Sequence, residues 1–229
     1  MSSQFGFITS WYPTILRGLA TTLEITVAGV LFGLALGLLL AIGDLYGPKP
    51  LKGAIAVYVE FFRGSPLFVQ IFIAVYGIPA LIPLPWGLGN HFLLAFFVFG
   101  FNSAAYQKGY MKGAMETVLA DQMDAGLSTG MTKVQTLWHV VIPQSLRVVI
   151  PSWTNEFCSL TKSSAALAWV GISDLAAAGN QISGHYYIVL PVWLFIGLVY
   201  FIWITAIARL ADWVYEKKKI PGIEMEMQS

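Results

Sequence analysis

The feature that most limits the fold is an almost unbroken apolar stretch, Ile25 to Ile42, in which Thr26 is the one polar side chain. A helix needs about 20 apolar residues to cross the hydrocarbon core of a bilayer, so we expect a membrane span at about residues 19–41. Over all 229 residues, 57% are hydrophobic and 11% are charged, whereas soluble domains carry roughly 25% charged residues. The sequence therefore predicts an integral membrane protein and excludes a soluble enzyme or a nucleic-acid-binding protein.

Four further apolar segments follow the first, at about residues 51–82, 88–110, 146–170 and 187–214. We therefore predict one all-α membrane domain over residues 1–229 with five transmembrane helices. The second loop and the fourth loop contain no Lys or Arg, while ten of the thirteen basic residues fall in or beside the other loops and the C-terminal end. Because Lys and Arg concentrate in cytoplasmic loops, this asymmetry predicts an N-terminus outside the cell and a C-terminus in the cytoplasm.

The third loop, at about residues 115–144, is too long for a simple turn and is expected to be structured. Residues 118–128 read as a short helix, Gly130 as a break, and residues 132–141 as a second helix that Pro143 ends or kinks. Apolar side chains on this loop suit docking into a groove of a partner protein, or else the loop packs on its own membrane domain. These side chains are Leu127, Met131, Val134 and Leu137.

Several polar side chains fall inside the predicted spans, where each needs a partner, water or a function. At 1.5 Å per residue, Arg63 and Glu156 both lie roughly 17 Å inward from the cytoplasmic side. The same layer includes Asn102, Ser103 and Asn155, and Lys162 lies further out along the helix of Glu156.

This polar layer has two interpretations. It is either a path for a polar solute or scaffolding, in which Glu60 neutralises Arg63 three residues away on the same helix. The sequence Gly64-Ser65-Pro66 should break the helix beside Arg63 and free backbone groups that neighbours or a wet cavity must satisfy.

Other patterns limit the chemistry of the chain. Gly29, Gly33 and Gly37 share one face of the first helix, which favours helix packing within the chain over a subunit interface. The lone Cys158 and three dispersed histidines give no metal site, and we expect no cofactor. The sequence contains no phosphate-binding G-x-x-x-x-G-K-[ST] motif, so ATP, if it is used, must bind to another chain.

The third loop also carries a specific resemblance. The stretch QMDAGLSTGMTKVQTLWHVVIPQSLR, from Gln122 to Arg147, resembles the cytoplasmic signature of ABC importer permeases. That signature has an acidic residue, two small residues, a glycine six positions after the acid, and an aliphatic-x-aliphatic-Pro ending. The matching positions are Asp124, Ala125, Gly126, Gly130, Val140, Ile142 and Pro143. Asp124 replaces the usual Glu, and Gly126 replaces the usual second Ala.

Three other stretches resemble the polar amino acid uptake branch of that family, of the histidine and glutamine permease type. They are GLATTLEITVAGVLFGLALG, VEFFRGSPLFVQIF and IPSWTNEFCSLTKSSAAL. The resemblance implies the type I ABC importer fold, in which two permease subunits work with two ATPase subunits and an extracytoplasmic solute-binding protein. It also implies that the third loop is a coupling helix seated in the ATPase. Where many members have an acidic residue after the lysine of the fourth segment, this chain has Ser163.

We therefore expect a permease subunit of an ATP-driven importer in the cytoplasmic (inner) membrane, which moves a polar amino acid and is not itself an enzyme. Its expected partners are ABC ATPase subunits, an amino acid-binding protein, an identical or related second permease, the amino acid substrate and membrane lipid, but no nucleic acid. Expected substrate contacts are Arg63, Asn102, Ser103, Asn155, Glu156 and Lys162. Two alternatives stay open: an ATP-independent secondary transporter or channel, and a membrane subunit that does not transport.

Overall fold

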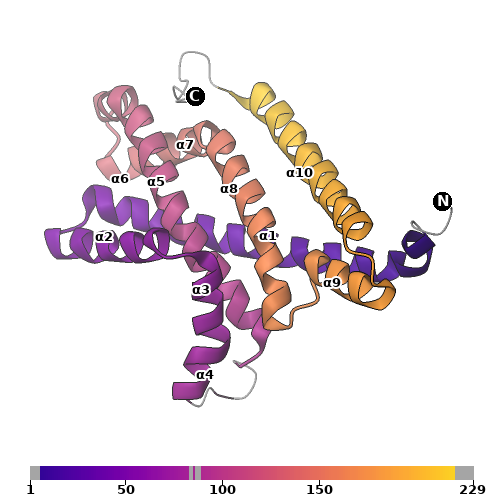
Figure 1. Cartoon of the computed structure of the whole chain (residues 1–229). Helices are drawn as coiled ribbons and strands as arrows, with labels where there is room; N and C mark the ends of the chain where they lie inside the picture. Colours follow the sequence, from indigo (N-terminus) through magenta and orange to yellow (C-terminus); the bar gives the residue numbers. More distant parts are fainter. Residues whose placement is uncertain (1–5, 83–84, 86–88, 220–229) are drawn as a thin grey trace.

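The computed structural model describes residues 6–82, 85 and 89–219, and every regular element among them is helical. The prediction of an all-α chain is confirmed. In chain order (Figure 1) the elements are α1 Gly6–Tyr46, α2 Lys49–Gly64, α3 Leu67–Phe72, the π-helical turn η1 Ile73–Gly77, α4 Ile78–Leu81, α5 His91–Ser128, α6 Lys133–Thr136, the π-helical turn η2 Leu137–Val141, α7 Ile142–Val148, α8 Ile150–Ser163, the 3-10 helix η3 Ser164–Val170, α9 Leu175–Tyr186 and α10 Leu190–Lys218.

Two of these helices, α1 and α10, are long and apolar enough to cross a membrane by themselves. The bent pair formed by α2 and α3–α4 also passes this test if it is counted as one broken span. Five spans therefore stay a prediction, since length and composition support two or three in the described part of the chain.

Helix α1 packs along α5, and the glycine stripe lies at this contact. A Cβ atom added at Gly29, Gly33 or Gly37 would lie 2.8–2.9 Å from side-chain atoms of α5. Small residues allow two helices to approach this closely. The prediction that the stripe serves packing within the chain is confirmed.

The segment predicted as one span at residues 51–82 is two helices that meet at an angle of 101°. The break falls at Ser65 and Pro66, whose ψ angles of 142° and 131° are extended. Proline disfavours the helical conformation in the residue before it, so the predicted break is confirmed and a straight helix is excluded. After the break, α3 turns away from the direction of α2 (Figure 1).

Helix α5 continues without interruption to Ser128 and so extends into the stretch predicted as the third loop. The predicted end of the span near residue 110 is therefore not a helix end, and a separate helix at residues 118–128 is wrong, since nothing in that stretch stops a helix. The predicted break at Gly130 is confirmed by its left-handed φ of 86°. Thr132 then caps α6 in a reciprocal capping box with Gln135.

Pro143 does not end the second helix of the loop. The chain is helical from Lys133 to Val148, with the π-helical turn η2 directly before the residues of α7 that include this proline. A proline cannot donate the backbone hydrogen bond of a regular α-helix, and a wider turn accommodates it.

The segment predicted at residues 146–170 is likewise divided, into the end of α7, then α8 and η3, which stops at Gly171 with a φ of 77°. The fourth loop contains a helix that was not predicted, α9. Leu175 and Ile182 of α9 pack against Phe7 and Ile15 of α1 and against α10 in one buried cluster.

Candidate functional site

A cavity of about 560 Å³ lies where the α2–α3 break, α5 and α8 meet. Four of the six predicted substrate-contacting residues line it: Arg63, Asn102, Asn155 and Glu156. The other described residues of the lining are Gly64, Ser65, Pro66, Leu67, Tyr106, Tyr110, Ser159, Leu160 and Ser163. The fold therefore brings polar side chains from three separate parts of the sequence to one cavity.

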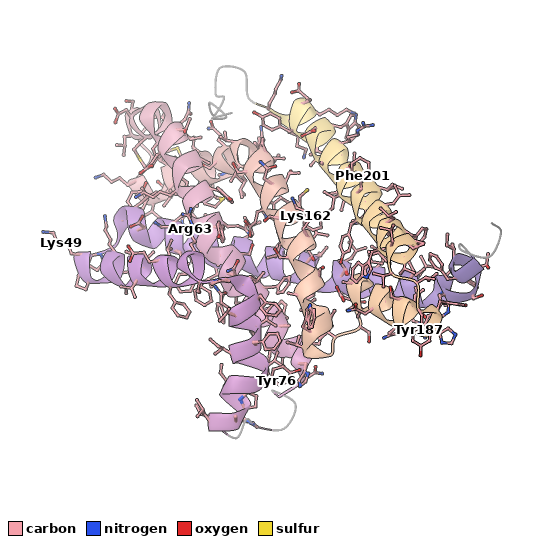
Figure 2. The ribbon with its side chains drawn as sticks, viewed as in Figure 1. Lys49, Arg63, Tyr76, Lys162, Tyr187 and Phe201 are labelled. Carbon is pink, nitrogen blue, oxygen red and sulfur yellow. The ribbon has the colours of Figure 1, made fainter. Side chains whose placement is uncertain are left out.

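Arg63 is the last basic residue of α2 and lies beside the helix break (Figure 2). Its guanidinium carbon is 5.0 Å from the centroid of the Tyr106 ring on α5, a cation–π distance. Among the residues that the structure describes, no ion pair joins Arg63 to Glu60. Arg63 instead contacts the Tyr106 ring and lies close enough to Glu156 to interact with its carboxylate electrostatically.

The backbone groups freed by the break are satisfied by two amide side chains. Gln70 Nε2 donates to the carbonyl oxygens of Phe62 at 2.9 Å and Ser65 at 3.0 Å. Asn102 Nδ2 donates to the same Phe62 oxygen and to Gln70 Oε1, each at 3.1 Å. Asn102 thus braces the break with its amide nitrogen, which leaves Oδ1 as the polar atom of this side chain that can accept from a ligand.

Glu156 lies on α8 and is only 5% exposed. The hydroxyl of Ser103 lies close enough to its carboxylate to interact with it electrostatically. Ser103 is fully buried and accepts from Gln107 Nε2 at 2.9 Å, and it is not among the described residues of the cavity lining. Ser103 therefore supports Glu156 from the α1–α5 contact.

Lys162, the sixth predicted residue, is exposed and is also outside the described lining. The face of α8 that lines the cavity instead continues through Ser159 and Ser163, three and seven residues after Glu156. On α5, Tyr106 and Tyr110 follow Asn102 at intervals of four residues. The sequence analysis missed these four residues, although helical spacing from Asn102 and Glu156 identifies them.

The loop between α5 and α8 presents a second candidate surface. Asp124, Ala125 and Pro143 are exposed, whereas Gly126 is buried. The predicted apolar contacts Leu127 and Val134 are also exposed, at 39% and 65%, but Leu137 is buried in the core.

One turn after Val134, Trp138 is 53% exposed, so it and not Leu137 continues the apolar surface. Asp124 lies in the last turns of α5, where the helix dipole disfavours a negative charge, and not at the start of a separate short helix.

Comparisons with known proteins agree with this architecture. Residues 29–220 match the family model described as "Binding-protein-dependent transport system inner membrane component". The chain is 30% identical to a probable amino-acid ABC transporter permease protein, PatM, of Vibrio harveyi, over 95% of this chain and 97% of that protein. It is 32% identical to the L-cystine transport system permease protein TcyB of Bacillus subtilis, over 77% and 74% of the two chains.

Two solved structures share the fold. A chain of an amino acid ABC transporter crystallised with histidines superimposes with a TM-score of 0.82 at 27% identity, covering 93% of this chain and 98% of that one. A chain of the MetNI methionine ABC transporter gives a TM-score of 0.72 at 18% identity, over 92% and 99% of the two chains, and supports the fold alone. This protein therefore belongs to the inner-membrane permease family of binding-protein-dependent transport systems, as the permease component of an amino acid ABC importer.

Proposed function

We propose that this chain moves a polar amino acid through the membrane and that its cavity between α2, α5 and α8 is the substrate site. The observation that carries the proposal is the presence of Arg63 and Glu156 in one cavity. A free amino acid brings one carboxylate and one ammonium group. The planar guanidinium of Arg63 can hold the carboxylate through two hydrogen bonds, while Glu156, Asn155 and Asn102 offer oxygen acceptors to the ammonium group.

Two predicted substrate contacts, Ser103 and Lys162, lie outside the described lining and have indirect roles in this proposal. Ser103 orients the Glu156 carboxylate from behind, and Lys162 adds a positive charge near the outer mouth of the path. The alternative in which Glu60 neutralises Arg63 has no support among the described ion pairs.

In the same proposal, transport is driven by ATP on separate ATPase subunits, with an extracytoplasmic binding protein delivering the substrate and a second permease completing the path. The loop after α5 is the coupling segment that seats in the ATPase. Its exposed Leu127, Val134 and Trp138 offer an apolar docking surface. The Schellman-like end of α5, in which the Met131 N–H donates to the Gly126 carbonyl at 3.1 Å, gives that surface a fixed shape.

Charge-conserving and charge-removing variants test the substrate site. Arg63→Lys loses the planar fork, and Glu156→Gln loses the negative charge. Each variant is expected to raise the amino acid concentration for half-maximal uptake by about 10- to 100-fold, the range for losing one charged hydrogen-bond partner. The measurement is ATP-dependent uptake by the assembled complex in proteoliposomes.

Glu60→Gln is the matched control, because Glu60 is exposed on the same helix as Arg63 and is not among the described lining residues. It should leave the concentration dependence unchanged. Unchanged concentration dependence in both Arg63→Lys and Glu156→Gln would move the substrate site elsewhere. Uptake that proceeds without ATP or an ATPase subunit would instead favour the secondary-transporter alternative.

A further inference from the structure

We infer that the cavity selects amino acids whose side chain carries no charge, and that Ser159 and Ser163 set this selectivity. The inference rests on the proposed function and narrows its substrate class. It is based on the charged residues of the cavity lining. It is also based on the residues of α8 that line the cavity after Glu156, which are Ser159 and Ser163.

The charges of the cavity balance those of an amino acid backbone. Among the described lining residues, Arg63 is the only cation and Glu156 the only anion. When they hold the α-carboxylate and the α-ammonium group, no charged side chain of the described lining is left to pair with a third charge on the ligand. An unpaired charge in a low-dielectric site is strongly disfavoured, so lysine, arginine, aspartate and glutamate are poor ligands.

The side chain of the ligand has a defined direction along α8. Ser159 and Ser163 lie about 4.5 Å and about 10.5 Å from Glu156 along the helix axis. Both serines line the cavity together with Tyr106 and Tyr110. A side chain that leaves the backbone-binding pair along this face of α8 therefore meets the hydroxyl groups of Ser159 and Ser163.

The hydrogen-bonding state of Ser163 refines the prediction. Its hydroxyl donates to the Ser159 carbonyl oxygen at 3.0 Å. The oxygen of that hydroxyl then remains as an acceptor, which suits the N–H groups of a side-chain amide or the O–H of an alcohol. A neutral polar side chain such as that of glutamine satisfies it without introducing a charge.

Equilibrium binding to the purified complex of permease and ATPase subunits, without the binding protein, tests the cavity directly. The probes are radiolabelled glutamine, arginine and glutamate. Glutamine should bind at least about tenfold more tightly than either charged amino acid. In Ser163→Asp, which adds an anion to the lining, the ratio of arginine to glutamine affinity should rise by at least about tenfold.

Ser152→Asp is the control, because Ser152 lies on the same helix outside the described lining, and it should leave the affinity ratio unchanged. Ser159→Asp repeats the test if Ser163→Asp does not assemble. Equal affinity of the unsubstituted complex for glutamine and a charged amino acid overturns the inference and leaves the amino acid permease function intact. A complex that binds none of the three probes overturns the inference, and absence of uptake of all three in proteoliposomes then overturns the proposed function as well.

Discussion

Gly126, which replaces the usual alanine of the permease signature, is matched by Thr136 across the turn between α5 and α6. A Cβ atom at Gly126 would lie 2.5 Å from both Cγ2 and Oγ1 of Thr136, which is fully buried. Thr136 also donates to the Thr132 carbonyl oxygen at 3.1 Å, so its position is fixed. The glycine is therefore required by the packing of the loop and is not a weak point in a helix.

This pair gives a prediction with an internal rescue. Gly126→Ala should lower the free energy of unfolding by about 1–3 kcal/mol through overpacking, and Thr136→Ala in the same chain should recover most of the loss. Gly113→Ala on α5 is the control, because its Cβ would meet nothing within 4 Å, and it should stabilise by about 0.5–1 kcal/mol. Thermal unfolding of the purified complex measures the two single variants and the double variant. Equal unfolding midpoints for Gly126→Ala and Gly113→Ala would contradict the packing argument.

The sequence predicted the depth of the site residues along their helices. It did not predict which face of each helix points into the cavity. Depth follows from counting residues at a fixed rise, and this placed Arg63, Asn102 and Glu156 in one layer. It did not distinguish Lys162, which is exposed outside the described lining, from Ser163, which lines the cavity. That distinction depends on how α8 is rotated against α2 and α5, which is set by tertiary packing.

At the scale of helices, hydropathy identified apolar segments but not helix ends. It missed the continuation of α5 to Ser128 because a helix that leaves an apolar environment becomes polar without stopping. It also missed α9, whose 12 residues are too short and too mixed to signal a span. By contrast, local chemistry predicted the break at Pro66 and the turn at Gly130, because proline and glycine act on the backbone itself.

The start of α9 provides a pH-dependent prediction. Asp174, in the loop between the predicted fourth and fifth spans, caps this helix by accepting from the Ala177 N–H at 2.8 Å. Burial raises the pKa of its carboxyl to about 6 from the usual 3.8. The folded state therefore binds the proton more tightly than the unfolded state, so this residue makes the protein more stable as the pH falls from about 7 to about 4.

Asp174→Asn keeps a good N-cap residue and removes the buried charge. The variant should be more stable than the unsubstituted protein at pH 7.5 by about 1–3 kcal/mol, and the difference should vanish near pH 4. Thermal unfolding of the complex across this pH range measures the effect, with Asp212→Asn on α10 as the control because Asp212 is exposed. A constant difference at all pH values would show that the carboxyl is not the titrating group.

At the scale of the whole molecule, several lysine side chains lie at one end. Asp44 of α1 pairs with Lys108 at 2.7 Å and Lys112 at 2.9 Å on α5, at the same end as the loop between α5 and α8. Lys217 and Lys218 end α10. The opposite end contains α9 and the start of α10, where Tyr187 is 91% exposed. This division agrees with a cytoplasmic end rich in lysine and an outer end rich in aromatic residues.

The orientation can be tested with single cysteines, because Cys158 is the one native cysteine and Cys158→Ser removes it. Lys49→Cys and Tyr187→Cys place a thiol at exposed positions on opposite sides of the molecule (Figure 2). With the N-terminus outside, α1 carries the chain to the cytoplasm before Lys49, while Tyr187 remains outside. A membrane-impermeant maleimide should therefore label Tyr187→Cys in intact spheroplasts and Lys49→Cys only after detergent is added. The reverse labelling pattern would mean that the chain has the opposite orientation in the membrane. Labelling of both variants in intact spheroplasts would mean that α1 does not cross the membrane.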